Sequence, residues 1–74
     1  MQGLSQCVLY NKNIFFAGVR DDSIYLVNAF RGDSISKVSA NKPIILSTPS
    51  DENLYYLEND GRGNYELKMF ESID

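Results

Sequence analysis

The chain is short and mildly acidic, with 74 residues, a net charge of −3, no histidine and one cysteine. This length allows one domain with a thin core, and a single cysteine excludes a disulfide within the chain. Because acidic and basic residues are interspersed, the sequence argues against nucleic acid as a partner.

No apolar run approaches the roughly 20 residues of a membrane helix. No basic segment followed by a long apolar stretch opens the chain, so no signal peptide is visible. These features predict a cytoplasmic protein that does not bind a membrane.

Short runs rich in Ile, Val, Tyr and Phe, separated by Asn, Asp, Gly and Ser, predict an all-β antiparallel meander. The predicted strands cover residues 4–9, 14–19, 23–30, 34–39, 44–47, 54–58 and 64–71. In the first strand, Cys7 is expected to be a small core residue, because free cysteine is usually buried.

Two of these strands carry the clearest patterns. Residues 24–27 are apolar on both sides, which predicts a central strand covered on both faces. In the last strand Tyr65, Leu67 and Met69 alternate with more polar residues, which predicts a half-buried strand with one apolar face.

Turn residues connect the predicted strands. Residues 10–13, 20–23, 31–34 and 59–64 are rich in Asn, Asp and Gly, which favours hairpins. Pro43 and Pro49 bracket the fifth strand, which is therefore expected at a sheet edge. Residues 1–74 are predicted to form a single β domain.

A shift of 40 residues brings similar segments together without gaps. Residues 13–17 fall on 53–57, Tyr25 falls on Tyr65 and Val27 falls on Leu67. A repeat of this length is typical of four-stranded propeller blades, so residues 1–40 and 41–74 are possible repeats.

Residues 42–57 read as a proline, an apolar strand, a Thr-Pro-Ser-Asp turn and a second apolar strand. This segment resembles the inter-blade segment of WD40-like and related β-propellers, and residues 24–33 resemble the strand and hairpin before it. The Trp-Asp and Gly-His dipeptides of WD40 repeats are absent.

The resemblance implies two propeller-blade-like repeats of about 40 residues. Two blades cannot close a ring, so such a chain would self-associate or complete another chain. The same strands would also fit a small barrel or a two-layer sandwich.

The sequence offers little catalytic chemistry. Without histidine it lacks the commonest general base, the usual catalytic triads and most zinc sites. The candidate acids lie in predicted turns or at strand ends, and they are Asp21, Asp22, Asp51, Glu52, Glu58 and Asp60. Residues 59–66 favour a hairpin turn over a calcium loop. We therefore expect no metal, no cofactor and no enzymatic activity.

Consecutive aromatic residues are the best indication of a binding surface. The pairs at 15–16 and 55–56 must point to opposite sides of their strands, so one ring of each pair meets either a second buried layer or a partner. Turns add a possible acidic patch at 21–22 or at 51–52. They also add an Arg-Gly-Asp tripeptide at 31–33, which resembles the integrin-recognition tripeptide but is expected to be a simple turn. The candidate partner-binding residues are Phe16, Asp21, Asp22, Arg31, Tyr55 and Tyr56.

These observations favour a non-enzymatic protein-interaction module that self-associates, as a homo-oligomer, or docks on another protein through sheet faces and edges. A small phage or mobile-element inhibitor that blocks a host protein is the first alternative. A structural assembly subunit is the second, and a small carboxylate-based hydrolase is the enzymatic one.

Overall fold

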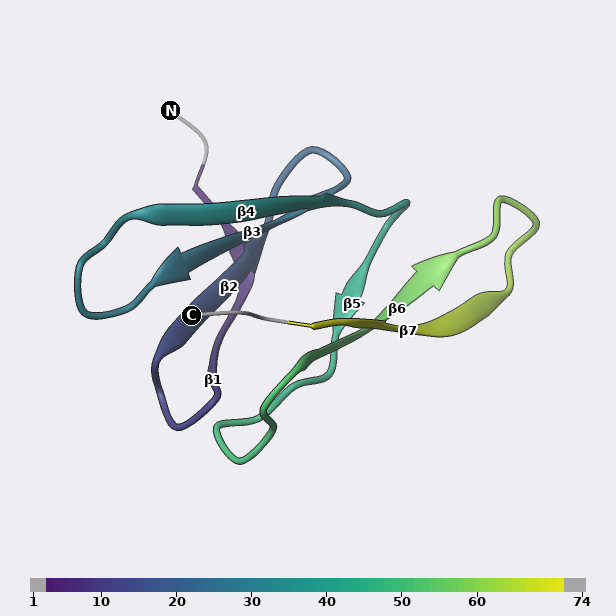
Figure 1. Ribbon diagram of the computed structural model, residues 1–74. Helices are drawn as coiled ribbons and strands as arrows, with labels where there is room; N and C mark the ends of the chain where they lie inside the picture. Colours follow the sequence, from purple (N-terminus) through teal and green to yellow (C-terminus); the bar gives the residue numbers. More distant parts are fainter. Residues whose placement is uncertain (1–2, 72–74) are drawn as a thin grey trace.

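The protein is all-β, with two antiparallel sheets, in the computed structural model that describes residues 3–71 (Figure 1). Sheet A contains β1 (Ser5–Tyr10), β2 (Phe15–Val19), β3 (Ser23–Asn28) and β4 (Ser34–Ser39). Sheet B contains β5 (Ile44–Ile45), β6 (Leu54–Asn59) and β7 (Tyr65–Phe70). Strands adjacent in a sheet are also adjacent in the chain, which confirms the predicted meander. The two sheets do not close on each other.

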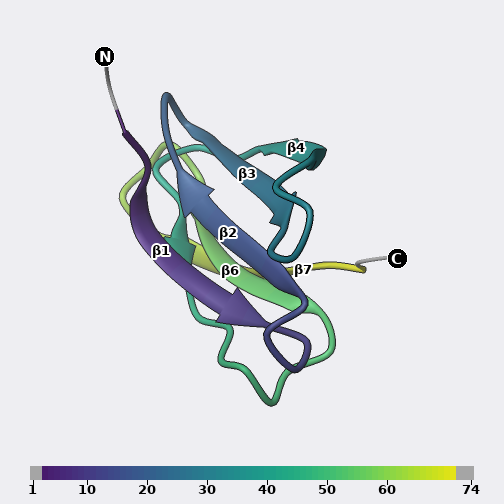
Figure 2. The same cartoon turned by 90° about the vertical axis from the view of Figure 1, so that its left-hand side faces the viewer.

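The core lies between the two sheets. Figure 2 looks onto sheet A, with β6 and β7 behind it. Both sheets contribute buried apolar side chains, namely Tyr10, Phe15, Ala17, Ile24, Leu26, Leu54 and Tyr56, and Ala40 joins them from the β4–β5 connection. Each sheet therefore buries one side against the other, as layered β architectures require.

Two predicted strands end early because side chains replace the ladder. Asn28 Oδ1 accepts hydrogen bonds from the backbone N–H groups of Phe30 and Arg31, at 3.0 and 2.9 Å, and so turns the chain at the end of β3. After β5, the Ser47 hydroxyl accepts a bond from Tyr55 N at 2.7 Å. Such local side-chain bonds compete with sheet pairing.

The β2–β3 hairpin is as tight as its sequence predicts. Asp21 and Asp22 have φ angles of 52° and 53°. Arg20 and Ser23 exchange two backbone hydrogen bonds of 3.0 Å across them. Two central residues with positive φ define the type I′ turn, whose twist matches that of the flanking strands.

Loops join the far ends of the two sheets. The N–H groups of Asn11 and Lys12 donate to the carbonyls of Asp51 and Pro49, at 2.7 and 2.8 Å. The receiving turn is held by Asp51 Oδ2, which accepts from Thr48 N at 2.8 Å. Residues 42–57, which resemble an inter-blade segment, thus comprise β5, this turn and the start of β6, all within sheet B.

A side-chain amide joins the near ends. Gln6 Nε2 donates to Pro43 O at 2.8 Å, and Gln6 Oε1 accepts from Ile45 N at 2.9 Å. A residue of a neighbouring parallel strand would make the same pair of bonds around residue 44. Gln6 has a φ of 54° and lies in a bulge, because two β1 residues oppose one β2 residue between the Ser5–Val19 and Val8–Ala17 pairs.

Two burial predictions are wrong. Cys7 is exposed, because Val8 and Tyr10 face the core and alternation along β1 therefore places Cys7 on the outer side with Leu9. The apolar side of β7 is also exposed. Pairing of Leu54 with Phe70 turns Phe70 toward the core and directs Tyr65, Leu67 and Met69 outward.

The central position of β3 is confirmed by the order of sheet A. Its coverage is uneven, since Ile24 and Leu26 are buried whereas Tyr25 and Val27, on the other side, are half-buried. This outer side of sheet A is therefore less well covered than the sequence pattern indicates.

Candidate interaction surfaces

A continuous apolar surface covers the outer side of sheet B. We call it the β7 face, and it consists of Ile44, Tyr55, Leu57, Tyr65, Leu67 and Met69. Ladder pairing aligns its members across the three strands, because Leu57 pairs with both Ile44 and Leu67, and Tyr55 pairs with Met69. Directly paired residues lie on the same side of a sheet.

The members of the β7 face that belong to strand β7 are exposed to solvent. The exposed fractions are 65% for Leu67, 52% for Met69 and 43% for Tyr65. Single exposed apolar residues are common on protein surfaces, but neighbouring ones on one sheet face are typical of interaction sites. In the described residues β7 also ends the order of sheet B, so its outer backbone edge is available for pairing.

A second, smaller apolar surface lies on the outer side of sheet A. We call it the Phe16 face, and it consists of Leu9, Phe16, Tyr25 and Val27. Phe16 pairs with both Leu9 and Val27, and Leu9 is 40% exposed. The candidate residue Phe16 is half-buried in the centre of this row.

Cationic side chains flank the Phe16 face at Tyr25. The Arg20 guanidinium carbon lies 4.9 Å from the centroid of the Tyr25 ring, and the Lys37 Nζ lies 5.5 Å from it. The pKa of Tyr25 is lowered, mainly by a hydrogen bond from Arg20. Burial of the phenol opposes this shift, and the positive charge of Lys37 adds to it. The border of this face is therefore positively charged.

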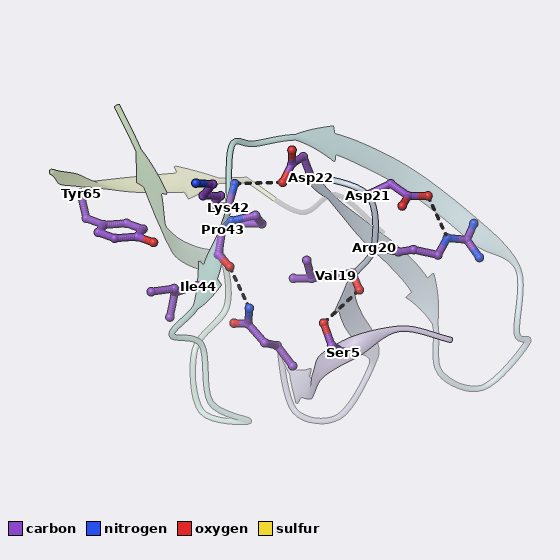
Figure 3. Close-up of a pocket in the computed structure, with 10 residues that line it drawn as sticks. Ser5, Val19, Arg20, Asp21, Asp22, Lys42, Pro43, Ile44 and Tyr65 are labelled. Carbon is purple, nitrogen blue, oxygen red and sulfur yellow. Dashed lines mark hydrogen bonds and ion pairs between the residues drawn. The ribbon is translucent and has the colours of Figure 1, made fainter. Parts of the chain in front are cut away.

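A polar groove of about 480 Å³ opens at the end of the β2–β3 hairpin. Figure 3 shows Asp21 and Asp22 above it, Lys42 and Tyr65 on one side and Ser5 on the other. Asp22 Oδ1 accepts a hydrogen bond from Lys42 N at 3.2 Å, and Asp21 Oδ2 lies 4.0 Å from Arg20 Nε. Both carboxylates therefore have structural partners.

The structure separates the six residues proposed from sequence. Phe16 lies on the Phe16 face, Tyr55 on the β7 face, and Asp21 and Asp22 line the groove. Arg31 lies at the opposite end of β3 from the two aspartates, with its Nε 3.4 Å from Asp33 Oδ2 and both side chains exposed.

Tyr56 is a core residue, with 7% of its surface exposed. Burial, and next the negative charge of Glu58, raise the pKa of its phenol. The Tyr55–Tyr56 pair thus divides as the alternation requires, since Tyr55 points outward and Tyr56 points toward sheet A.

Sequence reasoning missed the most exposed part of the β7 face, namely Tyr65, Leu67 and Met69. Their alternation is visible in the sequence, but on its own it predicts that Tyr65, Leu67 and Met69 form the buried side of the strand. The sequence signal that favours the opposite side is Phe70. It lies on the other side of β7 from these three residues, and it packs against the core.

Across residues 3–71, no three His, Cys, Asp or Glu side chains come together as a possible metal site. No helix in that part of the chain is long and apolar enough to cross a membrane. No family model, no curated protein and no solved structure matches the chain.

Proposed function

We propose that this chain is a non-enzymatic protein-interaction module whose β7 face binds a protein partner. The observation that carries the proposal is the row Ile44, Leu57 and Leu67, which places apolar side chains of three strands together on the surface. The polar groove is the weaker candidate, because Asp22 already accepts a hydrogen bond from Lys42 N and Asp21 lies beside Arg20.

Apolar burial is the main attraction that such a face can offer. Removing apolar surface from water contributes about 25 cal/mol per Å². Leu67 and Met69 lie next to the unpaired edge of β7, so a partner could cover their side chains and also extend the sheet. Tyr65, at the start of the same strand, adds an aromatic ring with a polar end, as is common at interfaces.

The arrangement also supports the proposal that the two sheets are WD40-like propeller blades. A four-stranded meander is followed by a three-stranded one, and one shared core lies between the two sheets. In Figure 1, β1 and β5 run in the same direction and so do β2 and β6, which is how successive blades stack.

The β7 face can be tested by comparing Leu67→Glu with Lys68→Glu. These neighbouring positions lie on opposite sides of β7, and the Lys68 side chain is 44% exposed, so both introduced carboxylates stay hydrated in the free chain. The wild-type protein serves as bait, and each protein that it captures is purified. The affinity of that protein for wild type, Leu67→Glu and Lys68→Glu is then measured by calorimetry.

The Leu67→Glu chain should bind at least about tenfold more weakly than wild type, because an unpaired carboxylate buried in an apolar interface costs more than about 1.4 kcal/mol. The Lys68→Glu chain should bind nearly as well as wild type. Equal loss in both variants, or no loss in Leu67→Glu for any partner including a second copy, would refute the assignment of the β7 face.

A further inference from the structure

The two sheets have the same plan, so their sides can be compared position by position. In sheet A, Ala17 pairs with Val8 and Leu26; in sheet B, Leu57 pairs with Ile44 and Leu67. Strand order and direction therefore match the row Val8, Ala17, Leu26 with the row Ile44, Leu57, Leu67. The first row faces the core, whereas the second belongs to the exposed β7 face.

The other side matches in the same way. Leu9 pairs with Phe16 in sheet A, and Ile45 pairs with Tyr56 in sheet B. Leu9 and Phe16 lie on the outer Phe16 face, whereas Ile45 and Tyr56 pack in the core. The matched positions carry an aliphatic residue opposite an aromatic residue in both sheets.

This matching keeps the 40-residue shift between β2 and β6, where Ala17 matches Leu57, but it departs from that shift by four residues between β1 and β5 and by one residue between β3 and β7. Phe15 pairs with Asn28, so the shift would pair Tyr55 with Lys68, but Tyr55 pairs with Met69. The connection between β6 and β7 is longer than that between β2 and β3, which accounts for the offset. The aromatic pairs at 15–16 and 55–56 occupy matching positions in β2 and β6.

Because the sheets stack in the same sense, the core-facing side of sheet A meets the opposite side of sheet B. The chain therefore contains one interface of this kind. A second copy of each of its two sides lies on the outside, one on the outer side of sheet B and one on the outer side of sheet A. The β7 face is the unused counterpart of the core-facing side of sheet A, and the Phe16 face is the unused counterpart of the core-facing side of sheet B.

We propose that the partner of the β7 face is the Phe16 face of a second copy of this chain, in a head-to-tail contact that repeats the interface between sheets A and B. This inference rests on the proposed function of the β7 face and adds the identity of its partner. A head-to-tail contact uses two different surfaces, so it continues from copy to copy until a ring closes or an open filament forms.

The two faces can be blocked separately. Leu67 and Leu9 are 65% and 40% exposed, so a carboxylate at either position remains hydrated in the monomer. Leu67→Glu blocks the β7 face and leaves the Phe16 face intact, whereas Leu9→Glu does the reverse. Circular dichroism checks that each variant is folded, and Leu9→Gln replaces Leu9→Glu if the latter does not fold.

Light scattering on a sizing column, across a tenfold concentration range, then gives the mass of each sample. Wild type should be a multimer and each variant alone a monomer. An equimolar mixture of the two variants should form a dimer with one copy of each, because the intact β7 face of one meets the intact Phe16 face of the other. Lys68→Glu should remain multimeric like wild type.

Two outcomes would overturn the head-to-tail contact. A wild-type monomer at every concentration excludes a second copy as the partner. Loss of association in Leu67→Glu with full association in Leu9→Glu would show that two β7 faces pair symmetrically. Neither outcome removes the proposed function, which fails separately when Leu67→Glu affects the binding of no protein at all.

Discussion

Replacing Gln6 with alanine should destabilise the fold, because the Gln6 side chain joins sheet A to the backbone of β5. The amide donates to Pro43 O at 2.8 Å and accepts from Ile45 N at 2.9 Å. A hydrogen bond of this kind contributes about 1 kcal/mol net, so the loss of both should cost about 2 kcal/mol. For a domain of this size, that corresponds to a fall in Tm of about 8–16 °C.

The backbone at Gln6 gives a second, independent expectation. Its φ of 54° lies in the left-handed region, where a residue with a Cβ is less stable than glycine by about 1 kcal/mol. Gln6→Gly should therefore lose the same two hydrogen bonds but recover part of the cost, and its stability should fall between that of wild type and that of Gln6→Ala.

Urea unfolding followed by circular dichroism measures these differences at one fixed protein concentration, because association between copies would add to the apparent stability. Cys7→Ala is the matched control, since Cys7 is the exposed neighbour whose Sγ donates a long, weak hydrogen bond of 3.6 Å to the nearby Leu4 carbonyl. If Gln6→Ala stays within about 0.5 kcal/mol of wild type, the bridge does not hold the two sheets together.

Three other perturbations have defined outcomes. Gly18→Ala should destabilise the protein by about 1–3 kcal/mol in urea unfolding, because the added Cβ would lie 2.7 Å from Leu4 Cβ; an unchanged midpoint would show that this segment shifts freely. Phe15→Ala should cost about 3–5 kcal/mol, since Phe15 is fully buried, and calorimetry should show a loss of most of the cooperative transition; a cost below about 1 kcal/mol would contradict its place in the core. Arg20→Gln should raise the pKa of Tyr25 toward its ordinary value, measured by ¹³C NMR of the ring during a pH titration, because the Arg20 hydrogen bond is the largest cause that lowers it. Since the folded-state pKa is the lower one, the stability from this contact is present above the unfolded-state pKa and is lost as the pH falls through the folded-state pKa; a pKa unchanged by the substitution would refute the cause.

Local sequence signals were sufficient for the elements of this fold. Strand propensity and alternation located all the strands that the structure describes, and Asp21-Asp22 indicated a tight hairpin that the structure forms as a type I′ turn. These features depend on residues close in sequence, so the chain by itself determined them. The early end of β3 could have been predicted too, because Asn28 is a residue type that bonds to the backbone just beyond it.

The sides of the strands were a different matter. Alternation in β7 shows that Tyr65, Leu67 and Met69 share one side, but both sides carry apolar residues once Phe70 is counted, and only the pairing of Leu54 with Phe70 decides which side packs on sheet A. The same limit applies to the Tyr55–Tyr56 pair, since either ring could have been the buried one.

Contacts between distant segments were likewise decided only by tertiary structure. Gln6 gives no local sign that its amide bonds across to residues 43 and 45, and Cys7 is exposed because the side of β1 that carries Val8 and Tyr10 is the one that packs on sheet B. The sequence determined the strands, their turns and the residues that share a side. The stacking of sheet A on sheet B determined which sides became core and which became the β7 and Phe16 faces, because burial depends on what packs against a side and not on its pattern alone.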